Sequence, residues 1–119
     1  MTILKLRILF DGAMLGPGKA ELLARIRETG SISAAGRSMG MSYKRAWSLV
    51  EEMNAAFAEP LVASARGGQG GGGAHLTAAG EAVLTLYATI MERAAAAAAE
   101  PVAALEAMLR SGSDRSGGK

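Results

Sequence analysis

The residues best suited to chemistry lie between positions 42 and 48, where hydroxyl, basic and aromatic side chains are clustered. The six that we single out are Ser42, Tyr43, Lys44, Arg45, Trp47 and Ser48. Hydroxyl and cationic groups donate hydrogen bonds to phosphate oxygens and to base edges, so this composition favours nucleic-acid recognition. The alternative for any one of them is a solvated helix face with scattered charge. Trp47 in particular is more often a core residue than a contact to a base or a sugar.

A helix beginning after Ser42 would arrange these side chains around its first turns. At 100° per residue, Lys44, Ser48 and Glu51 share one face. The residues whose helical spacing is predicted to mark its buried side are Tyr43, Ala46, Val50, Met53 and Phe57. By angle, the last four point inward, while Tyr43 and Trp47 flank one side and Arg45 the other. The acids Glu51 and Glu52 follow the cations, so the first turns of the helix are basic. The helix dipole places further positive charge at the same end, which adds attraction for phosphate.

A second, shorter helix is predicted just upstream, from Ser31 or Ser33 through Met39. Gly40 permits the positive φ that a tight turn often needs, and the small Ala-Gly pair at 35–36 lets the two helices approach closely. The seam between them is predicted to consist of Met39, Met41, Ala46, Val50 and Met53. This layout predicts a helix-turn-helix, whose second helix lies in the DNA major groove. Candidate DNA contacts on the flank are Ser31, Ser33 and Arg37.

The segment from 66 to 73 is nearly all glycine, with short apolar stretches at 61–65 and 75–76. This bracketing favours a β hairpin over a linker between two domains. A loop without side chains can bring its N–H groups close to a phosphate or into the minor groove. The candidate contacts are Arg66, Gly67, Gly68, Gln69, Gly70, Gly71 and His75. A nucleotide-binding P-loop is the rival interpretation, but no Lys-Ser/Thr pair follows the last glycine.

The composition excludes several classes of protein. The 119 residues include no cysteine, which excludes disulfides and thiolate metal sites. A His-based metal centre or a Ser-His-Asp triad would rest entirely on the single histidine, His75, which is a poor basis for either. We therefore expect no catalytic residues, no metal and no cofactor, and we expect that the protein is not an enzyme. No apolar stretch reaches membrane-spanning length and the first ten residues lack the order of a signal peptide, so we expect a cytoplasmic protein. The net charge of +2 does not by itself indicate a nucleic-acid partner.

The elements that position these residues follow from periodicity and from turn signals. In order, we predict a strand over 3–10, a turn or loop over 11–18, a helix over 19–29 stopped by Gly30, the two helices above, the hairpin, and a long helix capped by Thr77. Pro101 is expected to interrupt or restart that last helix, which then continues over 102–109. The fold class is mainly α with a small β hairpin, with one domain over residues 1–110 and a disordered tail over 111–119.

The long helix also predicts self-association. Its apolar side carries Leu84, Tyr87, Ile90 and Met91, followed by a run of alanines. One short domain cannot easily bury so much helix against itself, although alanine is also simply a good helix former. We expect a homodimer that holds two recognition helices about 34 Å apart on an inverted-repeat operator.

Several of these segments together resemble a known family. The resemblance rests on Gly30-Ser-Ile-Ser33, Ser42-Tyr-Lys44, Ala46-Trp47, Glu52-Met-Asn54, Leu61-Val62, the glycines from Gly67 to Gly73 with Ala74, and Leu76-Thr77. These resemble the N-terminal DNA-binding domain of the ModE family, the molybdate-responsive bacterial regulators related in this domain to LysR-type regulators. The resemblance covers about residues 3–95.

The resemblance implies a winged helix-turn-helix with an N-terminal strand and a long C-terminal dimerisation helix. It implies recognition by Ser42, Tyr43, Lys44 and Ser48, with Arg66 and the glycines from Gly67 to Gly73 as the wing. Gln69 stands where a basic residue is expected in this family. Full-length members carry C-terminal oxyanion-binding domains, and we expect this chain to lack one.

The sequence therefore predicts a sequence-specific double-stranded DNA-binding transcriptional regulator of the ModE type that controls molybdate-related genes. Two alternatives remain open at this point: a winged-helix module that binds another protein, and a small oxyanion (molybdate)-binding protein.

Overall fold

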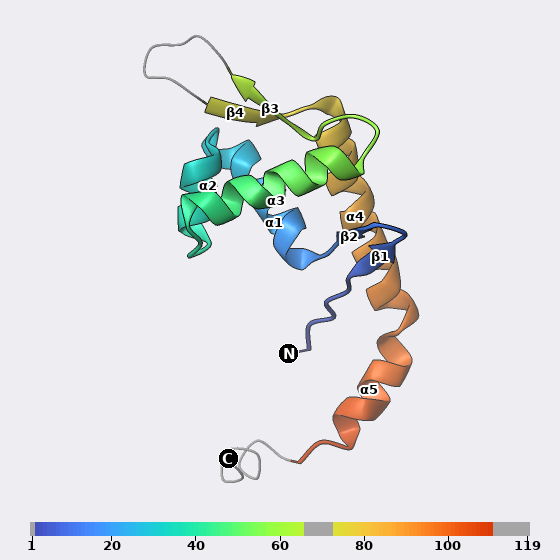
Figure 1. The fold of residues 1–119 in the computed structure, drawn as a ribbon. Helices are drawn as coiled ribbons and strands as arrows, with labels where there is room; N and C mark the ends of the chain where they lie inside the picture. Colours follow the sequence, from blue (N-terminus) through green and yellow to red (C-terminus); the bar gives the residue numbers. More distant parts are fainter. Residues whose placement is uncertain (1, 66–72, 111–119) are drawn as a thin grey trace.

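The computed structural model describes residues 2–65 and 73–110, and Figure 1 shows how their elements are arranged. In chain order these elements are β1 (Ile8–Phe10), β2 (Ala13–Leu15), α1 (Pro17–Thr29), α2 (Ile32–Ser38), α3 (Tyr43–Ala56), β3 (Val62–Ala65), β4 (Gly73–Leu76), α4 (Ala78–Ala97) and α5 (Ala99–Ala107). The predicted class, mainly α with a small β hairpin and a helix-turn-helix, is confirmed. The predicted tail over 111–119 lies outside the described residues.

Short polar side chains and glycines fix the ends of the helices, as the sequence predicts. The hydroxyl of Ser31 accepts a hydrogen bond from the Ala34 backbone N–H (3.0 Å) at the start of α2. The Ser42 hydroxyl caps α3 in the same way, through the Arg45 N–H (3.0 Å). Gly30 and Gly40 end α1 and the turn after α2 with φ of 72° and 75°, a left-handed conformation that glycine adopts without strain.

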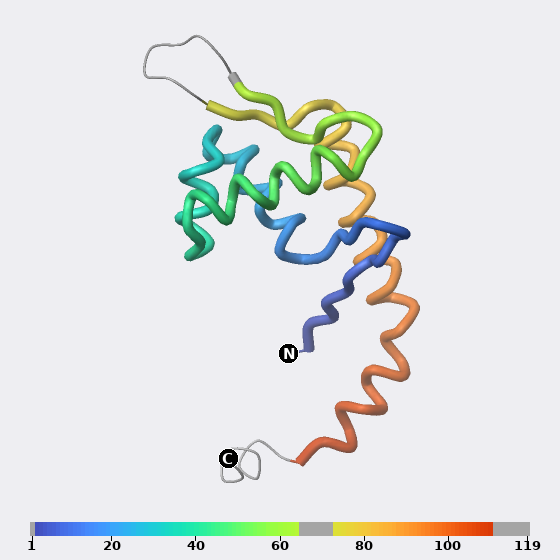
Figure 2. The backbone as a smooth tube through the Cα atoms, viewed as in Figure 1, coloured from blue at the N-terminus to red at the C-terminus, as the bar shows by residue number. Residues whose placement is uncertain are grey.

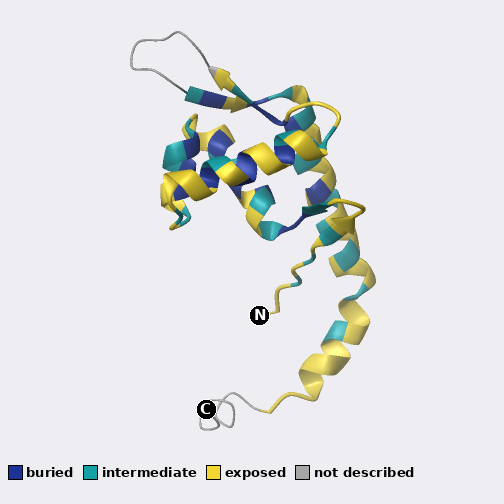
Figure 3. Cartoon of the chain, viewed as in Figure 1, coloured by how far each residue is buried: buried dark blue, intermediate teal, exposed yellow. Residues whose placement is uncertain are grey.

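The main core lies where α1, α2, α3 and the β3–β4 hairpin meet, and Figure 3 shows its buried residues on the inward faces of these elements. Its fully buried large side chains are Leu22, Leu23, Ile26, Val50, Met53 and Leu61. The two helices of the motif touch closely because Gly36 has no side chain: a Cβ placed there would lie 2.7 Å from the Cβ of Ala46. The small pair at 35–36 therefore sets the distance between α2 and α3.

The N-terminal segment differs from the predicted strand over 3–10. Only Ile8–Phe10 is a strand, and it pairs antiparallel with β2, which the sequence analysis assigned to a turn or loop. The pairing is short because β2 is followed directly by Gly16 and by Pro17, which begins α1. Residues 2–7 are not in a strand, since no second strand lies beside them to accept their backbone hydrogen bonds.

The long C-terminal helix leaves the core along its length. Tyr87 is its one buried large side chain; it joins Leu15 and Ala20 in a second cluster, and its hydroxyl donates to the Leu6 carbonyl (2.7 Å). The helix breaks at Ala98, and α5 is bent by 57° from α4. The predicted interruption near Pro101 is thus confirmed, with the break displaced toward the N-terminus because the proline ring clashes with the carbonyl four residues earlier.

Beyond that break the chain has little to pack against. No residue of α5 is buried, and Figures 1 and 2 show α5 extending away from the helical core toward the side where the N-terminus lies. A hydrogen bond in this region joins the Thr2 hydroxyl to the Glu106 carboxylate. Over the described ranges no single helix has both the length and the apolarity to cross a membrane; α4 and α5 meet both criteria only together, as a bent pair.

Candidate nucleic-acid interface

One face of α3 is free of packing and carries the candidate recognition residues. Lys44 and Ser48 are exposed, while Ala46, Val50 and Met53 are buried on the other side of the helix. The buried side therefore anchors α3 in the core and holds the polar face in one orientation.

Tyr43 and Trp47 form the edge of this face that lies toward the hairpin. Their rings meet edge to face, with centroids 6.2 Å apart and planes at 79°. Trp47 is half-buried and packs against the core, but the Tyr43 side chain is 58% exposed. The assignment of Tyr43 to the buried side of α3 is therefore wrong: as the first residue of the helix it lies beyond the core. Leu49, which the sequence analysis did not place in the core, is buried instead.

The charges of α3 are separated along its length. Lys44 and Arg45 are exposed in the first turn. Further along, the Glu52 carboxylate lies 3.1 Å from the Lys19 ammonium, which also donates to the Met14 carbonyl. The Lys19 ammonium partly offsets the charge of this acid on the side toward α1, and Glu51 and Glu52 both lie more than one turn beyond the two cations. The cations at that end retain their attraction for an anion.

The serines and the arginine of α2 lie beside the start of α3. Besides the Ser31 cap, the Ser33 hydroxyl accepts a hydrogen bond from the Arg37 guanidinium (3.4 Å), and Arg37 itself is exposed. Ser31 and Ser33 line a single hollow together with Tyr43 and Trp47. Arg37, Lys44, Arg45 and Ser48 do not line that hollow. The structure thus separates a neutral group that lines the hollow from a second group, outside the hollow, that contains all the predicted basic residues of α2 and α3.

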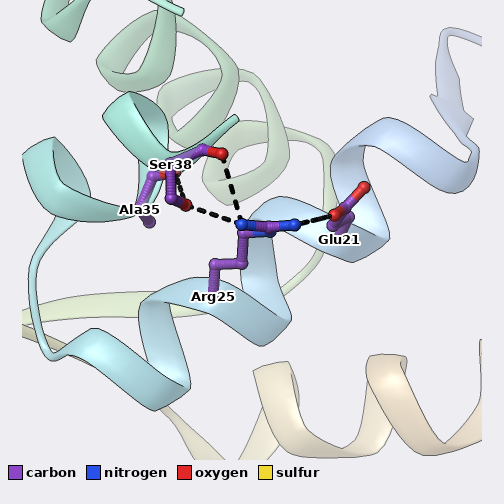
Figure 4. Close-up of polar contacts among 4 residues, drawn as sticks. All are labelled: Glu21, Arg25, Ala35 and Ser38. Atoms are coloured by element: carbon purple, nitrogen blue, oxygen red, sulfur yellow. Dashed lines mark hydrogen bonds and ion pairs between the residues drawn. The ribbon is translucent and has the colours of Figure 1, made fainter. Parts of the chain in front are cut away.

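A side-chain brace holds α2 against α1, as Figure 4 shows. The Arg25 guanidinium donates to the Glu21 carboxylate one turn earlier (2.5 and 2.9 Å). It also donates to the hydroxyl (2.9 Å) and the carbonyl (3.3 Å) of Ser38, the last residue of α2. Sequence reasoning missed this brace, because the spacing of Glu21 and Arg25 indicates a helix pair but gives no sign of Ser38.

The hairpin is anchored to α3 by the side chain of Asn54. Its carbonyl oxygen accepts from the Leu61 and Val62 backbone N–H groups (2.8 and 3.1 Å), and its amide donates to the Val62 carbonyl (3.1 Å). The backbone N–H of Ala74 also donates to the Gly30 carbonyl (2.9 Å). Helix α3 and the base of the hairpin are therefore fixed relative to one another by hydrogen bonds that no local sequence pattern predicts.

His75 lies apart from the other candidates. It is exposed in β4 between the buried Ala74 and Leu76, and it pairs with Ala63 of β3. Since alternate residues of a strand face opposite sides, His75 points away from the side of the hairpin that covers α3. The remaining hairpin candidates, Arg66, Gly67, Gly68, Gln69, Gly70 and Gly71, lie outside the described residues. Among the residues that are described, no group of three His, Cys, Asp or Glu side chains lies close enough to hold a metal.

Comparison with known proteins supports a regulatory role for this arrangement. Residues 18–81 match the profile of the bacterial regulatory helix-turn-helix proteins of the lysR family. The chain is 52% identical over 79 residues to the molybdenum-pterin-binding protein MopB of Rhodobacter capsulatus, 48% over 81 residues to the transcriptional regulator ModE of Yersinia pestis, and 45% over 71 residues to the dual regulator ModE of Escherichia coli K12. These alignments cover 60–66% of this chain but 27–31% of each relative, so the chain spans less than a third of their length. Residues 18–81 include α2, α3, β3 and β4, the four elements that form the site.

Proposed function

The chain belongs to the lysR family of bacterial regulatory helix-turn-helix proteins, and from that premise we propose that it binds specific double-stranded DNA sequences and regulates transcription. In this proposal α3 enters the major groove and presents Ser42, Tyr43, Lys44, Arg45, Trp47 and Ser48. The hairpin is the wing, and it reaches the adjacent minor groove with Arg66, the neighbouring glycines and Gln69. Ser31, Ser33, Arg37 and His75 are assigned to the flanking DNA backbone.

The observation that carries this proposal is the exposed basic start of α3 on a helix whose other side is buried. Lys44 and Arg45 stand clear of the core, while the acid Glu52 is paired with Lys19. A rigid helix with cations and hydroxyls in its first two turns suits the phosphate contacts and base contacts of a recognition helix. Nothing in this arrangement brings together a nucleophile, a base and an orienting group, so we infer a binding protein and not an enzyme.

We further propose that the protein is a homodimer joined through α4, α5 and the N-terminal segment. A hollow of about 440 Å³ on α5 is lined by Thr2, Val102, Leu105, Glu106, Met108 and Leu109. The Met108 side chain is 80% exposed and the Leu105 side chain 65%, although both are large and apolar. A second copy related by a twofold axis would cover this surface and place two recognition helices on an inverted repeat.

The dimer is tested by light scattering with chromatography at micromolar concentration. Leu105→Glu places a charge in the proposed interface and is expected to give the monomer mass. Ala104→Glu adds the same charge at an exposed position outside the hollow and should leave the dimer intact. A monomer mass for the unsubstituted protein would refute the dimer and weaken the inverted-repeat operator with it.

Specific DNA binding is tested by selecting bound sequences from a pool of random duplexes. We expect an enriched inverted repeat whose affinity falls steeply with salt concentration, because contacts to phosphates release counterions. A winged-helix module for another protein would enrich no sequence, and its binding would depend only weakly on salt.

The names of the relatives bear on the genes under control. Several are named as molybdenum-pterin-binding or molybdenum transport proteins, and we propose that this chain regulates molybdate-related genes in the cytoplasm. Calorimetric titration with molybdate examines the oxyanion alternative directly. Saturable binding to a chain that selects no DNA sequence would favour an oxyanion-binding protein over a regulator.

A further inference from the structure

A hollow lies between α2, the start of α3 and the hairpin, and we call it the serine hollow. It has a volume of about 270 Å³ and is lined by Ser31, Ile32, Ser33, Tyr43, Trp47, Ser64, Gly73 and Ala74. This is room for several water molecules, each of which occupies about 30 Å³ in the liquid. Three separate elements build its walls, so its shape depends on the anchored position of the hairpin against α3.

The place of the serine hollow determines which part of a duplex would meet it. In the proposed complex α3 occupies a major groove and the hairpin reaches the neighbouring minor groove. Adjacent grooves of a duplex are separated by a single sugar–phosphate backbone, which must therefore cross the space between α3 and the hairpin. We propose that the serine hollow seats this backbone, holding one phosphodiester and an adjoining deoxyribose. The inference rests on the proposed function and adds to it a specific ligand group and the unassigned residue Ser64.

The chemistry of the lining fits a phosphodiester bound by neutral donors. Ser31 and Ser33 each use a hydroxyl oxygen to accept a hydrogen bond inside the protein, which leaves the hydroxyl proton of each to donate outward. Ser64 is exposed on β3, opposite Ala74 in the register, and it lines the same hollow. Hydroxyl groups that donate to phosphate oxygens fix the position of a protein on a duplex without reading its sequence.

The remaining walls fit a sugar. Ile32 and Ala74 are buried, and the half-buried Trp47 ring closes the side toward α3. No charged side chain is among the residues that line the hollow. Contacts from these lining residues should therefore add affinity with little salt dependence of their own, because neutral donors displace no counterions. This separates the serine hollow from the basic face at Lys44. The Arg37 guanidinium, which donates to the Ser33 hydroxyl, is a separate, charged contact outside the lining.

The test fills the serine hollow from the strand that faces it. In Ser64→Leu the side chain occupies the space of the backbone, whereas Ala58→Leu adds a leucine at an exposed position between α3 and β3 that does not line the hollow. We expect Ser64→Leu to weaken binding to the selected operator about tenfold or more, the usual weight of hydrogen bonds to a charged group, with an unchanged salt slope. Ala58→Leu should bind like the unsubstituted protein. Thermal unfolding verifies that both variants are folded.

Trp47 supplies a second readout, since it is the only tryptophan of the chain and forms a wall of the hollow. Operator binding should change its fluorescence in the unsubstituted protein and change it much less in Ser64→Leu at saturating DNA. Ethylation of single phosphates needs no variant: one phosphate between the two contacted grooves of each half-site should block binding. If that phosphate tolerates ethylation, or if Ser64→Leu binds with unchanged affinity and an unchanged fluorescence response, the inference is wrong. If the unsubstituted protein binds no duplex at all, the proposed function itself fails.

Discussion

Replacing Gly36 by alanine tests whether the distance between α2 and α3 is set as tightly as the structure indicates. The new Cβ would lie 2.7 Å from the Ala46 Cβ and 3.3 Å from the Met41 Cγ. Carbon atoms in contact prefer a separation of about 3.5–4.0 Å, so the two helices must move apart by about 1 Å. A methyl group fixed to a helix backbone cannot rotate away, which puts the cost near the upper part of the range of about 1–3 kcal/mol for overpacked cores.

The gain in helix propensity opposes this cost. Alanine is favoured over glycine in a helix by about 1 kcal/mol, so the free energy of unfolding should fall by about 1–2 kcal/mol in Gly36→Ala. For a domain of this size that corresponds to a melting temperature lower by about 4 °C or more. Gly18→Ala is the matched control, because Gly18 is exposed in α1 with no atom within 4 Å of an added Cβ. It should raise stability by about 0.5 kcal/mol.

The double variant Gly36→Ala/Ala46→Gly makes the test sharp. Ala46→Gly alone should cost about 2 kcal/mol, from lost propensity and a lost buried methyl group. Combined, the two changes move one methyl group from α3 to α2 and remove the clash, so the double variant should approach the stability of the unsubstituted protein. Chemical denaturation measures all four proteins, and the operator affinity should fall in Gly36→Ala and recover in the double variant. Stability losses that simply add would refute the reasoning.

Three further predictions concern single side chains. Lys44→Ala should weaken operator binding by about 1–3 kcal/mol if the ammonium reads a base, or lower the salt slope by about 1 if it contacts phosphate; unchanged binding by a folded variant in an affinity titration would contradict its place in the interface. Burial raises the pKa of Tyr87, so its contribution to stability is complete below the usual tyrosine value of 10.0 and is lost as pH rises through the higher folded value. Tyr87→Phe should therefore cost about 1 kcal/mol at neutral pH and flatten the alkaline limb of a stability–pH curve, and an equally steep limb would contradict this assignment. Asn54→Ala should cost about 1–3 kcal/mol and accelerate hydrogen exchange of the two backbone amides that its side chain binds, while unchanged exchange there would show that the hairpin is anchored in another way.

The sequence predicts the helix-turn-helix well because its determinants are local. Ser31 and Ser42 cap their helices through groups three residues away, and Gly40 takes the left-handed conformation that the turn requires. The strand β2 was missed because three residues carry no periodic pattern, and only pairing with β1 makes them a strand. Segment-by-segment patterns place β2 in a loop for that reason.

The candidate site divides along the same line. Lys44 and Ser48 follow from helical spacing, so their shared exposed face is predictable. Ser64 and Asn54 gain their roles from contacts between elements, which no local pattern reports. Tyr43 falls between these cases: its spacing matches the buried side, but the first residue of a helix extends past the core, where spacing no longer indicates burial.

The hydrogen bond from Tyr87 to the Leu6 carbonyl also constrains the order in which the chain folds. The two residues are 81 positions apart, so Leu6 has no partner until most of this domain, up to Tyr87, has been synthesised. Meanwhile α1, α2 and α3 can assemble, because most of their contacts join residues that are near in sequence. Forming such contacts closes only short loops, which costs little conformational entropy. The β1–β2 hairpin should therefore dock last, against a helix-turn-helix that is already formed.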